Sequence, residues 1–394
     1  MKGLLDRSYW LGVGLTAVGL LSYVIQLTPI IFFFDFLWPR TPHSLGLSLV
    51  GLVLMIGGTL AHSSKRRVII LLGAVILIAW FIASTFLIYR EEIIDFASDE
   101  AHLYGTLYVP QNDGPHPALI IVHGKAPNTR APYRAAAEQF VRQGIATLVY
   151  DKRGFGASEG PLPYTYDQLA QDTEAGFVAL QQHSQIDPAR IGFIGYSEGG
   201  FVAPLAASRL PDAATLILVS GGGVPPSRTV HFEMETRLRI AGFSAAEVAE
   251  ALTLMQGVDN YYRTHTSEAE VMAMIKRAKQ SRWFETAFEM EPEAFPDTLD
   301  AIPFTDNYPA NLDFEPLTFL TRLDMPILFI FGEADTQVPA DESAAAIRTA
   351  LTHAGKQKFH IELFPMADHI IFIDYQPAPG YPELVNEWLQ NHLQ

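Results

Sequence analysis

The chain has 394 residues, of which 49% are hydrophobic and only 18% are charged, and its formal net charge is −16. So acidic a chain repels phosphate backbones, which argues against nucleic acid as a partner. It contains no cysteine, and this excludes disulfides, thiol catalysis and cysteine-ligated metal centres.

The first ninety residues differ in charge and hydropathy from the rest. Residues 1–90 carry a formal charge of +5, so the remainder carries −21. Three runs without Asp, Glu, Lys or Arg are each about long enough to cross a hydrocarbon core of roughly 30 Å: Tyr9–Phe34, Ser44–His62 and Val68–Tyr89. They predict three transmembrane helices, with residues 9–89 in contact with the lipid bilayer.

Basic residues near these runs predict an orientation. Lys65-Arg66-Arg67 connects the second run to the third, and Lys2 and Arg7 precede the first. Placing both groups on the cytoplasmic side satisfies the positive-inside rule. The prediction is therefore a multi-pass integral protein of the cell membrane whose remaining domain, residues 91–394, lies outside the cytoplasm.

From residue 91 onward, strand patterns alternate with helix patterns. Strands are predicted over Glu91–Phe96, His102–Val109, Ala118–Val122, Ala146–Tyr150, Ile191–Ile194, Thr215–Val219, Pro326–Phe331 and Phe359–Phe364. Helices are predicted over Tyr133–Gln143, Tyr166–Gln182, from Glu198, Asp341–Thr352 and Pro382–His392. This alternation indicates an α/β fold with a mostly parallel sheet flanked by helices. Ligands of such sheets bind outside the carboxyl ends of the strands.

The alternation stops between residues 224 and about 320. This interval contains amphipathic helical stretches, Ala245–Met255 and Ser267–Ser281, and a tract rich in proline and aromatic residues, Trp283–Pro309. It is read as an insertion between two strands. It is either a plain helical excursion or a cap over the site, and its place after a strand favours the cap.

The segment Gly195-Tyr196-Ser197-Glu198-Gly199 follows a predicted strand and precedes a predicted helix. A G-x-S-x-G pattern in that context is typical of a nucleophilic serine on a strained turn, where glycines two positions away avoid a collision. The alternative is a polar serine in a glycine-rich bend. The strand and helix around Ser197 favour the nucleophile.

A nucleophilic serine needs a base and an acid that orients the base, in the chain order serine, acid, histidine. Of the six histidines after Ser197, His369 lies in a short loop just past the strand that ends at Phe364. Asp335 and Glu333 both follow the strand Pro326–Phe331 and are the candidate acids. Asp368 adjoins His369 and is interpreted as structural.

The oxyanion of an acyl-transfer intermediate needs preset N–H donors. The backbone N–H groups of Glu198 and Lys125 are the candidates, since Lys125 follows His123-Gly124 at the end of a strand. His123 precedes the serine and is assigned a role in the loop. The run 151–158 fits no nucleotide-binding motif, and no metal or organic cofactor is predicted.

In chain order, these residues resemble the α/β-hydrolase superfamily: HG at 123–124, D-x-R-G-x-G-x-S at 151–158, G-x-S-x-G at 195–199, G-E-x-D at 332–335 and D-H at 368–369. The chain is similar to the bacterial esterase branch related to serine-aminopeptidase-like and dienelactone-hydrolase-like enzymes. This resemblance implies Asp335 as the acid and a cap after the sixth strand. It does not cover residues 1–90, and Lys125-Ala126-Pro127-Asn128 replaces the glycine-containing run that often follows HG.

The sequence therefore predicts a membrane-anchored serine hydrolase that uses Ser197, His369 and Asp335. A small or lipid-like acyl ester is the expected substrate. A peptidase or amidase with the same three residues is the alternative enzyme. A non-catalytic membrane receptor or scaffold is the alternative of another class.

Overall fold

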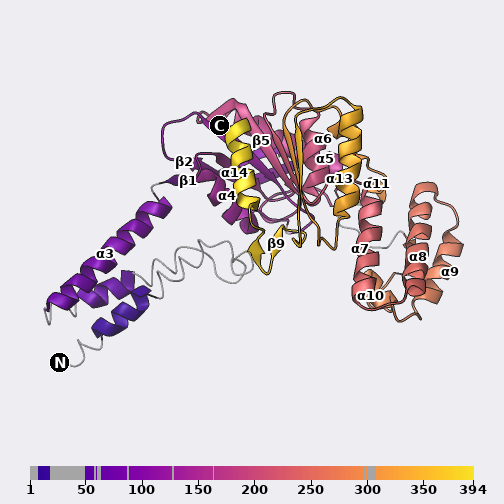
Figure 1. Ribbon diagram of the computed structural model, residues 1–394, viewed down its shortest axis with the longest axis horizontal. Helices are drawn as coiled ribbons and strands as arrows, with labels where there is room; N and C mark the ends of the chain where they lie inside the picture. The colour runs from indigo at the N-terminus through magenta and orange to yellow at the C-terminus, as the bar shows by residue number, and fades with distance from the viewer. Residues whose placement is uncertain are drawn as a thin grey trace.

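The fold is described from a computed structural model (Figure 1). The structure describes residues 8–17, 49–56, 59, 64–86, 88–126, 128–162, 164–296, 298–299 and 308–394.

An eight-stranded sheet in the order β1-β2-β4-β3-β5-β6-β7-β8 forms the centre. β1 and β2 are antiparallel to their neighbours, and all strands from β4 to β8 run parallel. Their bounds are Tyr89–Ser98 (β1), Ala101–Pro110 (β2), His116–Val122 (β3), Ala146–Tyr150 (β4), Ile186–Tyr196 (β5), Leu216–Val219 (β6), Ile327–Gly332 (β7) and Phe359–Phe364 (β8). A mostly parallel sheet with flanking helices, the arrangement of the α/β-hydrolase fold, is confirmed.

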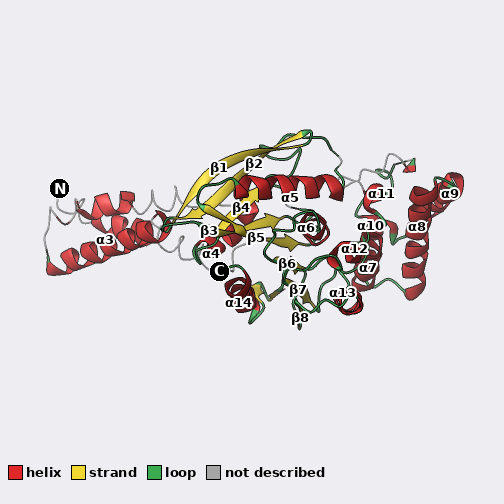
Figure 2. Cartoon of the chain, turned by 90° about the horizontal axis from the view of Figure 1, so that it is seen from above, coloured by secondary structure: helices red, strands yellow, loops and turns green. Residues whose placement is uncertain are grey.

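Helices cover both faces of the sheet (Figure 2). One face packs on α5 (Tyr166–Gln181), α6 (Gly199–Ala207) and α13 (Ala340–His353). The other packs on α4 (Arg134–Val141), which follows the short helix η2 (Ala131–Tyr133), and on α14 (Tyr381–His392). Alternate residues of β3 therefore enter opposite cores, since Ile120 faces the first and Ile121 the second.

The strand boundaries differ from the predicted ones by one or two residues in β1, β2, β3, β6 and β7, and by five residues at the start of β5. β5 begins at Ile186 instead of Ile191, because Ile186 pairs with His116 across an irregularity in the ladder. A small two-stranded ribbon, β9 (Phe372–Ile373) and β10 (Gln376–Pro377), follows β8 and was not predicted. Its strands are too short to leave an alternating pattern in the sequence.

The structure describes six helices between β6 and β7: α7 (Pro226–Ile240), α8 (Ala245–Thr264), α9 (Glu268–Ala278), α10 (Phe284–Phe288), α11 (Tyr308–Asn311) and α12 (Pro316–Leu320). α7 to α11 share a hydrophobic core of their own, with Trp283 and Phe284 at 1% and 0% exposure. In Figure 1, α8 and α9 lie beyond α7, away from the sheet and at the end of the molecule opposite α3. The insertion contacts the start of α5, where the Asn311 side chain accepts the backbone N–H of Tyr166 at 3.1 Å.

Among the residues described before β1, three segments are helical. They cover residues 8–17, residues 49–56 and α3 (Lys65–Phe86), and Tyr9, Met55 and Ala74 pack together between them. Several apolar side chains of these segments are exposed, among them Val53, Ile69 and Ile76 at 67–68%.

The predicted membrane location is not upheld by these segments. Within the described part of the chain, no helix has both the length and the apolar character needed to cross a bilayer, and this contradicts the predicted multi-pass location in the cell membrane. α3 begins at Lys65, so its first turn contains three cations. The rest of the runs Tyr9–Phe34 and Ser44–His62 lies outside the described residues.

Candidate active site

Ser197 stands between the end of β5 and the start of α6. Its φ of +53° lies in the left-handed region that side chains other than glycine rarely adopt. The turn is held from β6, because the Ser197 N–H donates to the carbonyl oxygen of Val219 at 2.8 Å. Ser197 is half-buried, and a strained backbone conformation such as this one is typical of functional sites.

Gly195 and Gly199 allow the turn to close. A Cβ on Gly195 would lie 2.4 Å from the carbonyl oxygen of Gly199, and a Cβ on Gly199 would lie 2.3 Å from that of Val122. Both contacts are with backbone atoms, which cannot move aside as a flexible side chain could. The close approach of β3, β5 and α6 thus requires glycine at both positions.

Of the two candidate acids, Asp335 and not Glu333 contacts the imidazole of His369. His369 Nδ1 lies 2.7 Å from Asp335 Oδ2, and the Asp335 side chain is fully buried. Its other oxygen accepts the N–H groups of Gln337 and Val338 at 2.7 and 3.0 Å. Glu333 is exposed. A carboxylate with these fixed partners can orient an imidazole.

The His369 loop packs closely on the end of β7. A Cβ on Gly332 would lie 2.3 Å from the carbonyl oxygens of Ala367 and Asp368. The Asp368 side chain accepts the N–H groups of Ile370 and Phe372 at 3.0 and 2.9 Å, so it shapes this loop. Because β5, β6, β7 and β8 are parallel neighbours, Ser197, Asp335 and His369 all follow strand ends at one edge of the sheet.

The loop after β3 lies beside Ser197. A Cβ on Gly124 would lie 3.3 Å from Ser197 Cβ, which brings the Gly124-Lys125 segment next to the serine. The Gly124 N–H donates to the Tyr133 hydroxyl at 3.1 Å. Glu198 is the N-cap residue of α6, and the Lys125 side chain is exposed. The oxyanion role of these two backbone N–H groups remains a prediction.

An ion pair that the sequence analysis missed lies beneath this loop. The ammonium group of Lys152 contacts the carboxylate of Glu198, and both side chains are 4% exposed. Lys152 Nζ also donates to the Gly124 carbonyl oxygen at 2.7 Å. The sequence offered one signal, since Lys152 and Glu198 are charged residues close to the ends of predicted strands. It did not show that the two side chains pair.

The remainder of the 151–158 run stabilises its own loop. Asp151 is paired with Arg130 and accepts the Ala157 N–H at 2.9 Å. Arg153 forms two hydrogen bonds with Asp172, at 2.9 and 2.7 Å, and both side chains are fully buried. These contacts account for the charges of the run without a phosphate ligand.

His123 is buried under the oxyanion loop. Its ring stacks on Tyr133 at a centroid distance of 4.2 Å, and neither ring nitrogen has a hydrogen-bond partner among the described residues. Burial, with a smaller contribution from the Lys152 charge, holds the pKa of His123 well below 6.5. Burial also raises the pKa of Tyr133 to about 12. Both groups are therefore neutral near pH 7.

Replacing His123 with phenylalanine is expected to make stability less sensitive to acid. Below pH 6.5 the unfolded histidine binds a proton that the folded one does not, so the wild type loses stability as pH falls. Between pH 6.5 and 5.5 this loss is about 1 kcal/mol for one such group. Urea unfolding at both pH values measures it. His353→Asn, at an exposed position on α13, is the control for the loss of any histidine. A dependence of stability on pH that is the same in His123→Phe as in the wild type would contradict the lowered pKa of His123.

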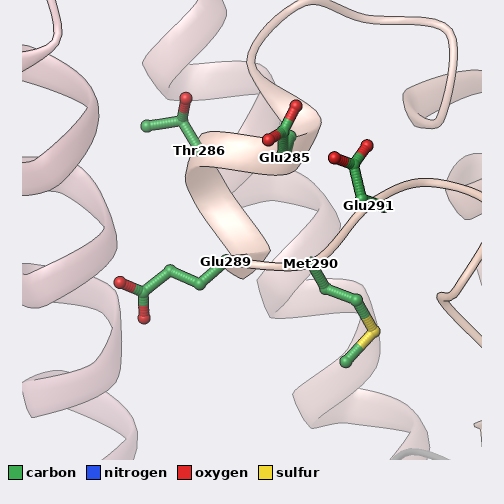
Figure 3. A pocket seen from close by; sticks show the side chains of 5 residues that line it. All are labelled: Glu285, Thr286, Glu289, Met290 and Glu291. Carbon is green, nitrogen blue, oxygen red and sulfur yellow. The ribbon is translucent and has the colours of Figure 1, made fainter.

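A hollow elsewhere in the molecule is unrelated to these residues. It has a volume of about 360 Å³ and is lined by Glu285, Thr286, Glu289, Met290 and Glu291 around α10 (Figure 3). None of them is a predicted site residue. In the described residues, no group of three or more His, Asp or Glu side chains is arranged to hold a metal ion.

The chain is similar to several known proteins. A family model described as serine aminopeptidase, S33, matches residues 113–376. Esterase EstD of Thermotoga maritima is 24% identical over 68% of this chain, and the match spans 58% of EstD, less than two thirds of its length. The quorum-quenching protein AidA of Acinetobacter baumannii is 24% identical over 68% of this chain and 84% of AidA. The Pyrococcus furiosus esterase Pf2001 has a TM-score of 0.51 and 18% identity over 78% of this chain and 94% of that one, which shows a shared fold.

Proposed function

The chain belongs to the serine aminopeptidase S33 family and is an esterase-like serine hydrolase, and we propose that it cleaves a carboxylic ester through an acyl-enzyme on Ser197. The 2.7 Å contact between His369 Nδ1 and Asp335 Oδ2 carries this proposal. It leaves Nε2 as the ring nitrogen available to a serine, at the sheet edge that Ser197 shares.

In the proposed reaction, His369 Nε2 takes the Ser197 hydroxyl proton as Oγ attacks the ester carbonyl carbon. The backbone N–H groups of Glu198 and Lys125 stabilise the oxyanion. The bond to the alcohol oxygen then breaks, and His369 gives that oxygen its proton. Water then attacks the acyl carbon and loses a proton to His369. The bond between the acyl carbon and Ser197 Oγ breaks, His369 returns that proton to Oγ, and the carboxylic acid leaves with Ser197 and His369 restored.

We further propose that the insertion of residues about 224–320 is a cap on a hydrolase domain of residues 91–394, preceded by a separate segment, 1–90. The chain leaves β6 at Val219, whose carbonyl oxygen accepts the Ser197 N–H, and α7 begins at Pro226. The insertion therefore departs from the sheet beside the nucleophile. A separate hydrophobic core supports its description as a unit.

Labelling with a fluorophosphonate tests the nucleophile, because such reagents phosphonylate activated serines. We expect labelling of the wild type and none of Ser197→Ala. Ser220→Ala is the matched control, since Ser220 also has a φ of +53° at a strand end but is buried, and it should label like the wild type. Equal labelling of wild type and Ser197→Ala would refute the role of Ser197.

Hydrolysis of a substrate panel separates the ester proposal from the peptidase alternative. The panel contains p-nitrophenyl esters of short and long acyl chains beside aminoacyl p-nitroanilides. We expect kcat/KM to be highest for an ester, and the preferred acyl length identifies the substrate class. Faster cleavage of the anilides would favour the peptidase or amidase alternative.

A further inference from the structure

We propose that Lys152 and Glu198 are positioning residues that hold the two oxyanion donors in place. This inference rests on the proposed function, because it concerns the same acyl-transfer site. The two residues come from separate segments: Lys152 follows β4, and Glu198 follows the nucleophile. Neither side chain takes part in the proton transfers proposed for Ser197 and His369.

The ammonium group of Lys152 joins both donor segments. It contacts the carboxylate of Glu198, whose own backbone N–H is one proposed donor. It also donates to the carbonyl oxygen of Gly124 at 2.7 Å. A third polar atom, the Tyr164 hydroxyl oxygen, lies 3.4 Å away. One buried cation therefore links the elbow and the loop after β3.

Lys152 orients the second proposed donor, the Lys125 N–H, by binding the carbonyl oxygen of Gly124. The Gly124 C=O and the Lys125 N–H belong to one planar peptide unit and point in opposite directions when it is trans. Fixing the oxygen on Lys152 therefore fixes the direction of the Lys125 N–H. On the other side, the Gly124 N–H is held by the Tyr133 hydroxyl at 3.1 Å. Glycine would otherwise let this peptide rotate easily.

Stability alone does not explain a charged pair in this place. Two charges lose hydration when they are buried, and apolar residues of similar volume often give equal or greater stability. An apolar pair could fill the same space, but it could not donate to the Gly124 carbonyl. What only Lys152 supplies is a hydrogen bond to the oxyanion loop from the same atom that contacts Glu198.

Lys152→Met is expected to lower kcat about 10²–10³-fold, as the loss of one oxyanion donor does, and to leave KM within about threefold. The Ki of a trifluoromethyl ketone, which forms a tetrahedral adduct, should rise by a similar factor. The Ki of the carboxylate product should not change. These two inhibitors separate the geometry of the oxyanion site from ground-state binding.

A double variant separates positioning from stability. Lys152→Met leaves the Glu198 carboxylate buried without its cation, so the single variant is expected to be less stable than the wild type. Adding Glu198→Leu removes that charge and keeps the backbone N–H. We expect the thermal midpoint to recover in the double variant while kcat stays low, because the Gly124 carbonyl still lacks its donor.

The Arg153–Asp172 pair provides the matched control. Arg153 lies in the same loop as Lys152 and the pair is also buried, but the Arg153 guanidinium donates to Asp172 and to the Gln168 carbonyl oxygen, both on α5. Arg153→Met with Asp172→Leu should change the thermal midpoint without changing kcat more than about threefold below that midpoint.

Two results would overturn the inference. One is recovery of kcat together with stability in the Lys152→Met, Glu198→Leu variant. The other is a loss of kcat no larger than that of the Arg153/Asp172 control. Fluorophosphonate labelling distinguishes this failure from failure of the proposed function. An unlabelled wild-type Ser197 refutes both, whereas a labelled wild type with an equally fast Lys152→Met refutes only the positioning role.

Discussion

Ser197→Ala and His369→Ala should each lower kcat for ester hydrolysis by about 10⁶-fold. The serine forms the covalent bond and the histidine moves its proton, so neither step proceeds without both groups. The double variant should therefore be no slower than either single one. Steady-state kinetics on the best ester, with circular dichroism to show that each variant is folded, measures this.

Asp335→Asn should have a smaller effect, about 10⁴-fold, because the histidine remains but its Nδ1 loses a charged acceptor that sets its tautomer. Glu333→Gln is the matched control, since Glu333 lies on the same loop but is exposed, and it should retain wild-type kcat. Two results would contradict a cooperating triad. One is a loss of kcat in the Ser197/His369 double variant equal to the product of the two single losses, and the other is an equal loss of kcat in Asp335→Asn and Glu333→Gln.

Gly199→Ala should destabilise the fold by about 3 kcal/mol or more, because the added Cβ would lie 2.3 Å from the carbonyl oxygen of Val122, the last residue of β3. Neither β3 nor α6 can shift without disturbing the packing of the other. For a chain of this size the thermal midpoint should fall by at least roughly 6 °C. Differential scanning fluorimetry and urea unfolding measure the loss.

Gly257→Ala is the opposite case and serves as the control. Gly257 lies within α8, and a Cβ there meets Met274 and Val271 only at ordinary distances of 3.6 Å or more. Alanine is the better helix former, so this change should raise stability by about 0.5–1 kcal/mol. A Gly199→Ala protein as stable as Gly257→Ala would show that the elbow does not need its glycine.

The secondary structure from residue 91 onward could be predicted because it depends on the hydrophobic pattern of residues that are close in the chain. Continuous apolar runs such as Ala118–Val122 became buried strands, and amphipathic stretches such as Tyr166–Gln182 became covering helices. The pattern around Ser197 was equally local, since a turn between a strand and a helix is made by adjacent residues. Position after strand ends, too, was enough to nominate His369 and the two acids.

The prediction of a multi-pass membrane location, which hydropathy suggested for residues 1–90, was wrong. An apolar run does not state where its helix begins, and α3 starts at Lys65 with the basic residues that were assigned to a connection. The two earlier runs contain described helical pieces only over 8–17 and 49–56. The third apolar run therefore located a helix but did not give its first residue.

The sequence by itself determined the order of strands and helices, the strained turn at Ser197 and the residues available at strand ends, because each depends on near neighbours in the chain. The resemblance to a known superfamily had already favoured Asp335 over Glu333, but only the tertiary structure showed the contact of Asp335 with His369 and the link that Lys152 makes between Glu198 and the Gly124 loop. Both contacts depend on which strands lie side by side and how far a side chain reaches across them. Such contacts join residues 28 to 46 positions apart, and no periodicity within one segment records them.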